Sequence, residues 1–445
     1  MGMRARIGRF TAALVLLLSA VSCFKDSRFT PGTDGGNSEG RVVPTRQDAL
    51  PNRQVMMMVS AGYNSLSGYL KTDLNDLSSN YLPQGTDPDT HVLVVLAHLP
   101  TGGDLYTTPA PVLYRMYAQP DGAVVRDTLK CWGEEDGLCD PAVFQEALEL
   151  VYRRFPARGY GMVFSSHATG WMPEGYYRDP SKVDPQYSAN GRLAAPAHHF
   201  PPLLRQEGEP EVKTLGEDEL TERTLEMELE DFAASIPMHL DYLLIDACLS
   251  GCVEVAHALR GKADFVGFSP TEVLASGFDY STITGHLLRD VPDPEAVCRD
   301  YFAYYDKQTD MYRSATICLV DTRRMDALET VCRELFGQYR EALAQLKGSA
   351  VQGYFRYNRH FFYDLKDVLV KAGITEAEEA RLDAALDQCV VYKAATPWFM
   401  YGGSYGFPIS QYCGMSMYLP SMGTDMLDTY YKQHVSWNQA TGLVP

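Results

Sequence analysis

The stretch His239-Leu-Asp-Tyr-Leu-Leu-Ile-Asp-Ala-Cys-Leu-Ser-Gly251 decides the fold of this chain. Its apolar run, residues 242–245, is bounded by polar residues and predicts a buried central strand, and residues 253–260 after it have a helical pattern. Open α/β sheets place their chemistry at such strand-to-helix turns, outside the carboxyl ends of the strands. The stretch therefore places Cys248 where a nucleophile is expected, with Asp246 beside it.

Apolar runs of strand length alternate with segments of helical spacing as far as residue 320. Besides the opening stretch, the predicted strands are residues 55–61, 91–98, 161–167, 263–268 and 315–320, and residues 112–117 with 123–129 indicate a hairpin. The predicted helices are residues 66–77, 141–155, 217–236 and 253–260. Because strands that alternate with helices form parallel sheets covered on both faces, this order predicts an α/β fold with a mostly parallel central sheet.

The pattern is looser after residue 320. Residues 325–346 and 376–386 have helical spacing, and residues 390–392 and 414–419 are strand-like. Two arrangements fit this pattern, a subdomain packed on the sheet or further layers of one domain. We assign residues 55–320 to the main domain and residues 321–445 to a C-terminal extension packed on the sheet.

The N-terminus has the pattern of a secretory signal. Three arginines precede an apolar run at residues 12–18, and small residues lead into Cys23. This ending resembles the lipobox of bacterial lipoproteins, although Ala20 stands where Leu is usual; a plain secretory signal cut nearby is the alternative. We predict a signal peptide over residues 1–22 and a lipid-anchored flexible tether over residues 23–54. The protein is then an exported lipoprotein of the bacterial cell envelope, in the outer membrane or at the cell surface.

The composition is that of a globular protein with a strong acidic excess. The chain has 445 residues, of which 45% are hydrophobic and 22% charged, and its formal net charge is −18. Removal of the signal takes away three arginines and no acid, which leaves a charge of −21. An acidic chain repels phosphate backbones, so no nucleic-acid partner is expected.

Nine cysteines remain besides Cys23. An odd number in an exported chain leaves at least one thiol free. Cys131 and Cys139 flank an acidic loop and are the pair with a spacing suited to a disulfide, whereas Cys318 and Cys413 lie in apolar runs typical of buried thiols.

Two predicted strands end in residues that form a known catalytic combination. His167 follows the third strand of the series and Cys248 follows the opening stretch. An imidazole beside a thiol lowers the thiol pKa or protonates the departing amine, which is how thiol hydrolases divide the work. Taken singly, each residue has a plain structural interpretation, a loop histidine and a buried inert thiol.

The block Ser166-His-Ala-Thr-Gly-Trp171, together with Leu244-Ile-Asp-Ala-Cys248, resembles the clostripain family of cysteine peptidases, which share the α/β sandwich of caspases, gingipains and legumains. In that group one apolar strand ends in His-Gly and a later one in Asp-Ala-Cys or a close variant. Further similar segments are residues 253–257, 269–273, 277–280 and 413–420. The resemblance covers most of residues 55–420 and implies a caspase-like three-layer α/β/α sandwich.

The resemblance also implies an oxyanion site made by the backbone N–H groups of Ala168 and Cys248. The family has Gly where this chain has Ala168. Alanine keeps the N–H group but adds a methyl group and loses easy access to left-handed backbone angles. The change is harmful only if the site requires a positive φ.

The resemblance implies a preference for cleavage after Arg or Lys, through acids at the base of the pocket. Asp246, two positions before Cys248, matches one of these acids. The second acid is expected just before residues 277–280. Either Ser276 stands in its place in this chain, or the acid is displaced. Asp246 has an alternative interpretation as a structural acid that accepts backbone N–H bonds.

A long loop rich in proline, residues 172–215, separates His167 from Cys248. Several members of the family cut themselves between these two residues. The loop offers basic residues in a setting suited to cleavage, namely Arg178, Lys182, Arg192, Arg205 and Lys213. The alternative is a passive surface insertion.

No cofactor is expected from the sequence. Metal-binding and phosphate-binding motifs are absent, and His198-His199 is an isolated pair in the loop. Calcium is possible by the family resemblance, but the acids of this chain mark no specific site.

The sequence therefore predicts a cysteine endopeptidase with a Cys248–His167 dyad that acts on protein or peptide substrates and contacts the membrane through its lipid anchor. The alternative function is an inactive surface lipoprotein of the same fold that binds a peptide or protein partner, and the Ala168 departure motivates it.

Overall fold

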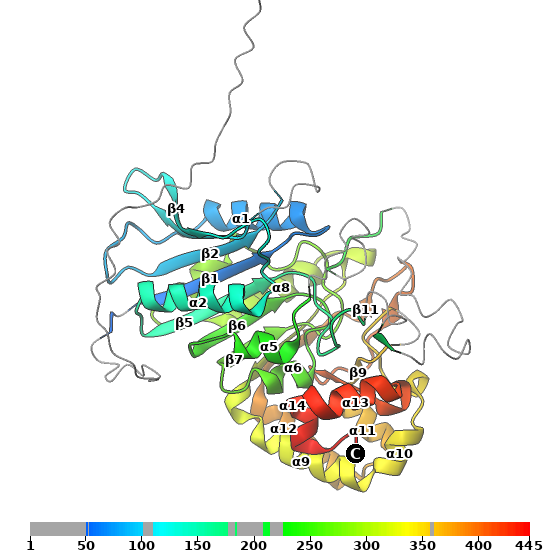
Figure 1. Cartoon of the computed structure of the whole chain (residues 1–445). Coiled ribbons are helices and arrows are strands. Elements are labelled where there is room, and N and C mark those ends of the chain that lie inside the picture. The colour runs from blue at the N-terminus through cyan, green and yellow to red at the C-terminus, as the bar shows by residue number, and fades with distance from the viewer. Residues whose placement is uncertain are drawn as a thin grey trace, which may run out of the picture. The chain divides into compact units, whose positions relative to one another are not determined.

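A sheet of nine strands organises the structure, a computed structural model (Figure 1). The strands lie in the order β10-β8-β7-β6-β5-β1-β2-β3-β4. Their bounds are β1 Gln54–Ala61, β2 Val92–His98, β3 Val112–Ala118, β4 Val124–Cys131, β5 Gly159–Ser165, β6 Leu240–Asp246, β7 Ala263–Phe268, β8 Thr316–Asp321 and β10 Val390–Ala395.

The structure describes residues 50–51, 53–100, 110–176, 183–184, 208–213, 226–356 and 360–445. The predicted signal peptide, Cys23 and nearly all of the predicted tether lie outside these ranges, and so does most of the 172–215 loop. No helix within the described ranges has the length and apolar character needed to cross a membrane.

The centre of the sheet is parallel, as the sequence predicts. Strands β2, β1, β5, β6 and β7 run in the same direction. Their residues are almost continuously buried, which explains their unbroken apolar runs. The strand pairs at both edges are antiparallel.

The predicted 315–320 strand is β8, which lies beside the parallel strands but pairs antiparallel with β7. The connection between them includes α8 (Pro294–Asp306). It leaves the carboxyl end of β7 and enters β8 at the same end of the sheet, so it does not cross back to the other end of the strands. Helix α8 is not among the predicted helices, although Asp293 caps its first turn and Pro294 begins it.

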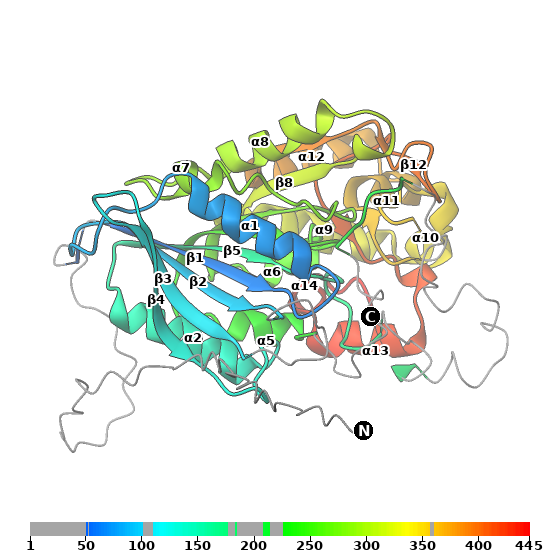
Figure 2. The ribbon, with the colours of Figure 1, turned by 90° about the horizontal axis from the view of Figure 1, so that it is seen from above.

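Helices cover both faces of the sheet, and Figure 2 shows α1 (Ser67–Ser79) and α8 on one face with α2 (Pro141–Arg154) and α5 (Leu229–Ala234) on the other. The predicted helix at residues 141–155 is α2, whose first turn is capped by Asp140. Its apolar side chains recur at helical spacing and are buried against the sheet. The structure therefore has the predicted three layers.

The residues after 321 complete the same sheet. They supply the edge strand β10 and the helices α9 (Asp326–Gln338), α10 (Arg340–Gln345), α11 (Leu365–Ala372), α12 (Glu376–Cys389), α13 (Asp425–His434) and α14 (Ser436–Thr441). Their buried side chains belong to the hydrophobic cluster that also contains the central strands. The predicted 325–346 helix is divided into α9 and α10 at Tyr339, and the predicted 414–419 strand is reduced to β13 (Ser416–Met417).

Candidate active site

The pairing of β5 with β6 brings the two predicted catalytic residues to neighbouring strand ends. Ser165 lies opposite Asp246 in this parallel pair. His167 and Cys248 each follow two residues later, so they leave the sheet at the same level and the same edge. This is the edge at which α/β sheets bind their ligands.

Cys248 is completely buried and held by one backbone segment. Its Sγ accepts a hydrogen bond from the N–H of Val273 at 3.0 Å and lies 3.7 Å from the carbonyl oxygen of Val273. The next residue, Leu249, has a φ of +57°, in the left-handed region that is costly for a branched side chain. The turn after β6 is therefore a sharp one, with Cys248 at its start.

A segment of the interdyad loop, residues 211–213, lies as a short extended strand beside residues 273–275. The N–H of Lys213 donates to the carbonyl of Val273 at 2.9 Å, and the N–H of Ala275 donates to the carbonyl of Glu211 at 2.8 Å. Val212 and Leu274 form an antiparallel bridge. The same residue, Val273, thus contacts both Cys248 and Lys213, which places Lys213 next to the thiol.

The ammonium group of Lys213 is fully buried. It forms an ion pair with Asp246, and it also donates to Ser165 Oγ at 2.9 Å and to the Asp246 carbonyl at 3.3 Å. These contacts match the three donors of an ammonium group. Because an unpaired buried charge is very costly, the site is built for a cation at this position.

The carboxylate of Asp246 is the negatively charged partner of Lys213 at the bottom of this site. Besides Lys213, it accepts hydrogen bonds from Tyr280 Oη at 2.8 Å and from Ser165 Oγ at 3.3 Å. Its Oδ1 is buried and has no hydrogen-bond partner among the described residues. Ser165, at the end of β5, and Tyr280, in the loop after β7, therefore orient the Asp246 carboxylate toward the Lys213 side chain.

A second carboxylate lies near Lys213, but it is Asp73 on α1 and not a residue before the 277–280 block. Asp73 is buried and interacts electrostatically with Lys213 and Asp246. Burial raises the pKa of Asp73 to about 8, the charge of Asp246 raises it further, and Lys213 opposes the shift. No sequence motif marks Asp73, because α1 reaches the site only through the β1–α1–β2 crossover.

Ser276, the residue predicted before the 277–280 block, has an exposed side chain. The neighbouring Gly277 faces the pocket instead, with a φ of +58°. A Cβ atom at Gly277 would lie 2.6 Å from Lys213 Nζ and would clash with Asp246. Glycine at this position leaves room for the long basic side chain.

His167 is half-buried beside the same segment. Its Nε2 lies 3.3 Å from Ser65 Oγ, and its Nδ1 is buried without a well-formed hydrogen bond to any described residue. Burial lowers the pKa of His167 to about 4, the charge of Lys213 lowers it further, and the backbone of Lys213 opposes the shift. The imidazole is therefore neutral near pH 7, and the Lys213 residue lies close enough to influence it.

The Ala168 departure introduces no backbone strain. Ala168 is not among the described non-glycine residues with a positive φ. The left-handed position in this loop is Gly170, with a φ of +65°, where a Cβ would lie 2.7 Å from the carbonyl oxygen of Leu249. The N–H of Ala168 is thus presented by an ordinary backbone conformation.

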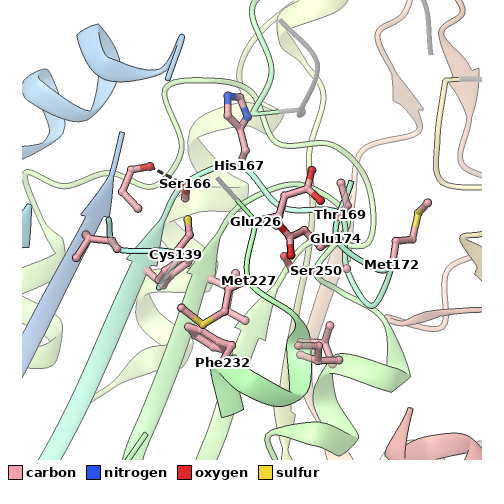
Figure 3. Close-up of a pocket in the computed structure, with 18 residues that line it drawn as sticks. Cys139, Ser166, His167, Thr169, Met172, Glu174, Glu226, Met227, Phe232 and Ser250 are labelled. Atoms are coloured by element: carbon pink, nitrogen blue, oxygen red, sulfur yellow. Dashed lines mark hydrogen bonds between the residues drawn. The ribbon is translucent and has the colours of Figure 1, made fainter. Parts of the chain in front are cut away.

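A pocket opens beside His167, and Figure 3 shows His167 at one end with Met227 and Phe232 at the other. Its lining includes His167 and Ala168 but not Cys248 or Asp246. The site of the basic side chain is therefore not an open pocket in this structure, because Lys213 fills it.

The nine cysteines in the described ranges form no disulfide with one another. The pair that the sequence offers, Cys131 with Cys139, is therefore not joined. Within the same ranges, no group of His, Cys, Asp or Glu has the arrangement of a metal site.

Comparisons with known proteins agree with this architecture. The sequence matches the clostripain family, peptidase family C11, over residues 203–442. The structure is similar to an inactive zymogen C11 protease from Parabacteroides distasonis, with 26% identity, coverage of 90% of this chain and 99% of that chain, and a TM-score of 0.68. No curated protein sequence gives a significant match.

The fold is also similar to that of a secreted C11 cysteine protease from Bacteroides thetaiotaomicron in complex with an irreversible peptide inhibitor. The identity is 21%, the coverage is 87% of this chain and 99% of that chain, and the TM-score is 0.66. The family match spans more than half of this chain and includes Cys248. The chain belongs to the clostripain family and is a cysteine-type endopeptidase.

Proposed function

We propose that this chain is the uncut precursor of an endopeptidase that cleaves after Lys or Arg and that it activates itself by cleavage after Lys213. One observation carries this proposal: the Lys213 ammonium group is buried and paired with Asp246. The backbone of Lys213 is hydrogen-bonded to Val273, the residue whose N–H donates to the Sγ of Cys248. A segment of the chain thus lies at the active site as a peptide substrate would lie.

In the proposed reaction, Cys248 Sγ attacks the carbonyl carbon of the basic residue, and the peptide C–N bond breaks. His167 protonates the departing amine, and the acyl group remains on Cys248 as a thioester. Water, assisted by His167, then hydrolyses the thioester and restores the thiol. The N–H groups of Ala168 and Cys248 are the candidate donors for the oxyanion.

The preference for a basic residue rests on the groups that surround Lys213. Asp246 supplies the paired carboxylate, and Ser165 and the Asp246 carbonyl accept the remaining N–H groups. Asp73 lies nearby, but its pKa of about 8 keeps it mostly protonated near neutral pH, so it adds little charge there. Arginine offers more donors in a planar fork that matches a carboxylate. Of the five basic residues offered by the loop, Lys213 is the proposed cleavage site; Arg178, Lys182, Arg192 and Arg205 lie outside the described residues.

The uncut chain is inactive on other substrates in this proposal, because Lys213 fills the site that their basic residue needs. The similar Parabacteroides distasonis protein is described as an inactive zymogen, which is consistent with such a state. The alternative of an inactive binding protein loses its motivation, since Ala168 has an ordinary backbone conformation.

Export and lipid attachment remain part of the proposal. The Bacteroides thetaiotaomicron relative is described as secreted, and the N-terminal pattern of this chain fits a lipoprotein signal that ends at Cys23. The proposed substrates are accordingly proteins or peptides outside the cytoplasm.

A panel of fluorogenic peptides that differ only in the residue before the cut tests the proposed function. The protein cut after Lys213 is expected to turn over the Lys and Arg peptides and to leave the Ala and Glu peptides uncut, and Cys248→Ala is expected to abolish turnover. Turnover that persists in Cys248→Ala, or equal turnover of all peptides, would contradict the proposal.

A further inference from the structure

Arg356 is a buried arginine held between two buried glutamates. Its Nε donates to Glu272 Oε2 at 2.7 Å and its Nη2 to Glu272 Oε1 at 2.8 Å, which is a two-point fork. Its Nη1 donates to Glu209 Oε1 at 2.6 Å. The side chains of Arg356, Glu209 and Glu272 are 3%, 1% and 0% exposed, so this cluster is deep in the protein and not a surface ion pair.

The two glutamates come from different parts of the chain. Glu272 adjoins Val273, the residue that contacts both Cys248 and the Lys213 backbone. Glu209 belongs to the loop segment that ends at Lys213, four residues before it. Between Glu209 and Lys213, Pro210 and Glu211 are only partly buried. The segment is thus held at two buried charged side chains, Lys213 at one end and Glu209 at the other.

Two partners of Glu209 among the described residues come from outside its own loop segment. Arg356 donates to its Oε1, and the backbone N–H of Ser404 donates to its Oε2 at 3.3 Å. Glu272 fixes the orientation of the guanidinium group independently of Glu209, because the fork uses different nitrogens. A positioned guanidinium and a backbone N–H are the donors that a carboxylate requires in a desolvated site.

We propose that Arg356 and the Ser404 N–H form a substrate subsite for a carboxylate four residues before the basic residue at the cut. This inference rests on the proposed function, in which the 209–213 segment marks the path of a substrate. After cleavage and departure of the segment, these donors no longer hold Glu209, and a Glu side chain of an incoming peptide takes its place. The preferred substrates then carry two charges at fixed spacing, an acid followed four residues later by Lys or Arg.

Four reporter peptides test this subsite. Their sequence before the reporter copies the segment, Glu-Pro-Glu-Val-Lys, with Glu, Gln, Ala or Lys at the first position. With the cut protein, kcat/KM is expected to be about tenfold higher for Glu than for Ala, since a charged hydrogen bond is involved, with Gln between them and Lys lowest. Equal kcat/KM values for the four peptides would overturn the subsite and leave the peptidase intact, whereas failure to cut any of them would overturn the proposed function as well.

A triple variant assigns the preference to Arg356. Glu209→Gln, Glu272→Gln and Arg356→Gln together remove all three charges of the cluster, so no lone buried charge remains in the uncut chain, and the Glu-to-Ala ratio of kcat/KM is expected to fall to about one. The matched control is Glu334→Gln with Arg381→Gln, which removes an ion pair whose side chains are about half exposed; it is expected to keep the ratio. A ratio unchanged in the first variant would overturn the assignment. If that variant does not fold, the four peptides with the unaltered protein decide.

Discussion

Lys213 and Asp246 form the buried ion pair on which the proposed precursor state depends. Removal of one partner leaves the other charge buried and unpaired, which typically costs about 3–5 kcal/mol, whereas neutral replacement of both costs much less. In a Cys248→Ala background, we expect Lys213→Met and Asp246→Asn each to lower the free energy of unfolding by roughly 3 kcal/mol. The double variant should lose clearly less than the sum, as measured by urea unfolding.

The exposed pair of Glu334 with Arg381 serves again as the control, because surface pairs contribute only about 0–1 kcal/mol. Single-variant losses at Lys213 and Asp246 that are no larger than this control, or strictly additive losses, would show that the two charges are not coupled in a buried site.

Asp73 gives the site a pH dependence. Its pKa is about 8 in the folded chain, because burial disfavours its charged form, and near 3.8 in the unfolded chain. The folded state therefore binds more protons between these values, so this residue's contribution to stability falls as pH rises from about 4 to about 8. In a Cys248→Ala background, we compare the chain that keeps Asp73 with the Asp73→Asn variant. The free energy of unfolding of the first, relative to the second, is expected to fall as pH rises from about 4 to about 8. Parallel stability curves across the window would contradict it.

The residues of the site differ in how far the sequence predicts them. Asp246, Cys248 and His167 follow apolar runs that are recognisable as strands, so their place at one sheet edge is a consequence of the strand order. Asp73 belongs to an amphipathic helix, and only the crossover connection brings it to the site. Ser276 lies one residue before Gly277, the left-handed position beside Lys213, and its own side chain is exposed.

At the level of the elements, the loop after β5 carries Ala168 in an ordinary backbone conformation. Substitution of Ala168 by glycine restores the residue usual in the family but relieves no strain. We expect Ala168→Gly to change kcat/KM by less than about threefold and to lower stability by about 0.4–1 kcal/mol through the greater freedom of the unfolded chain. Steady-state kinetics with the basic peptides measures the first effect, and a gain of tenfold or more would show that the methyl group hinders the oxyanion site.

The parallel centre of the sheet was predictable because buried parallel strands have continuous apolar runs. The antiparallel direction of β8 was not predictable, since its apolar run is the same in either direction. The extended segment at residues 211–213 carries no strand pattern of its own. Its conformation depends on backbone hydrogen bonds to residues 273–275 and on two buried side chains, Glu209 and Lys213.

For the whole molecule, the N-terminal signal predicts attachment to a membrane through Cys23. Cys23→Ala removes the acceptor of the lipid, so we expect the variant to move from the membrane fraction to the soluble fraction of a bacterial host. Cell fractionation followed by mass measurement of the N-terminal peptide detects both the shift and the loss of the lipid mass. A Cys23→Ala protein that stays in the membrane fraction would favour another mode of attachment.

The most direct test of the central proposal is the position of the self-inflicted cut. Purified precursor and its Cys248→Ala variant are incubated under the same conditions, and the products are identified by intact mass and N-terminal sequencing. We expect the unaltered chain to give a new fragment that begins at Thr214, and the variant to remain whole. A first cut elsewhere in the loop, or a Thr214 fragment that also forms in pure Cys248→Ala, would contradict self-activation at Lys213.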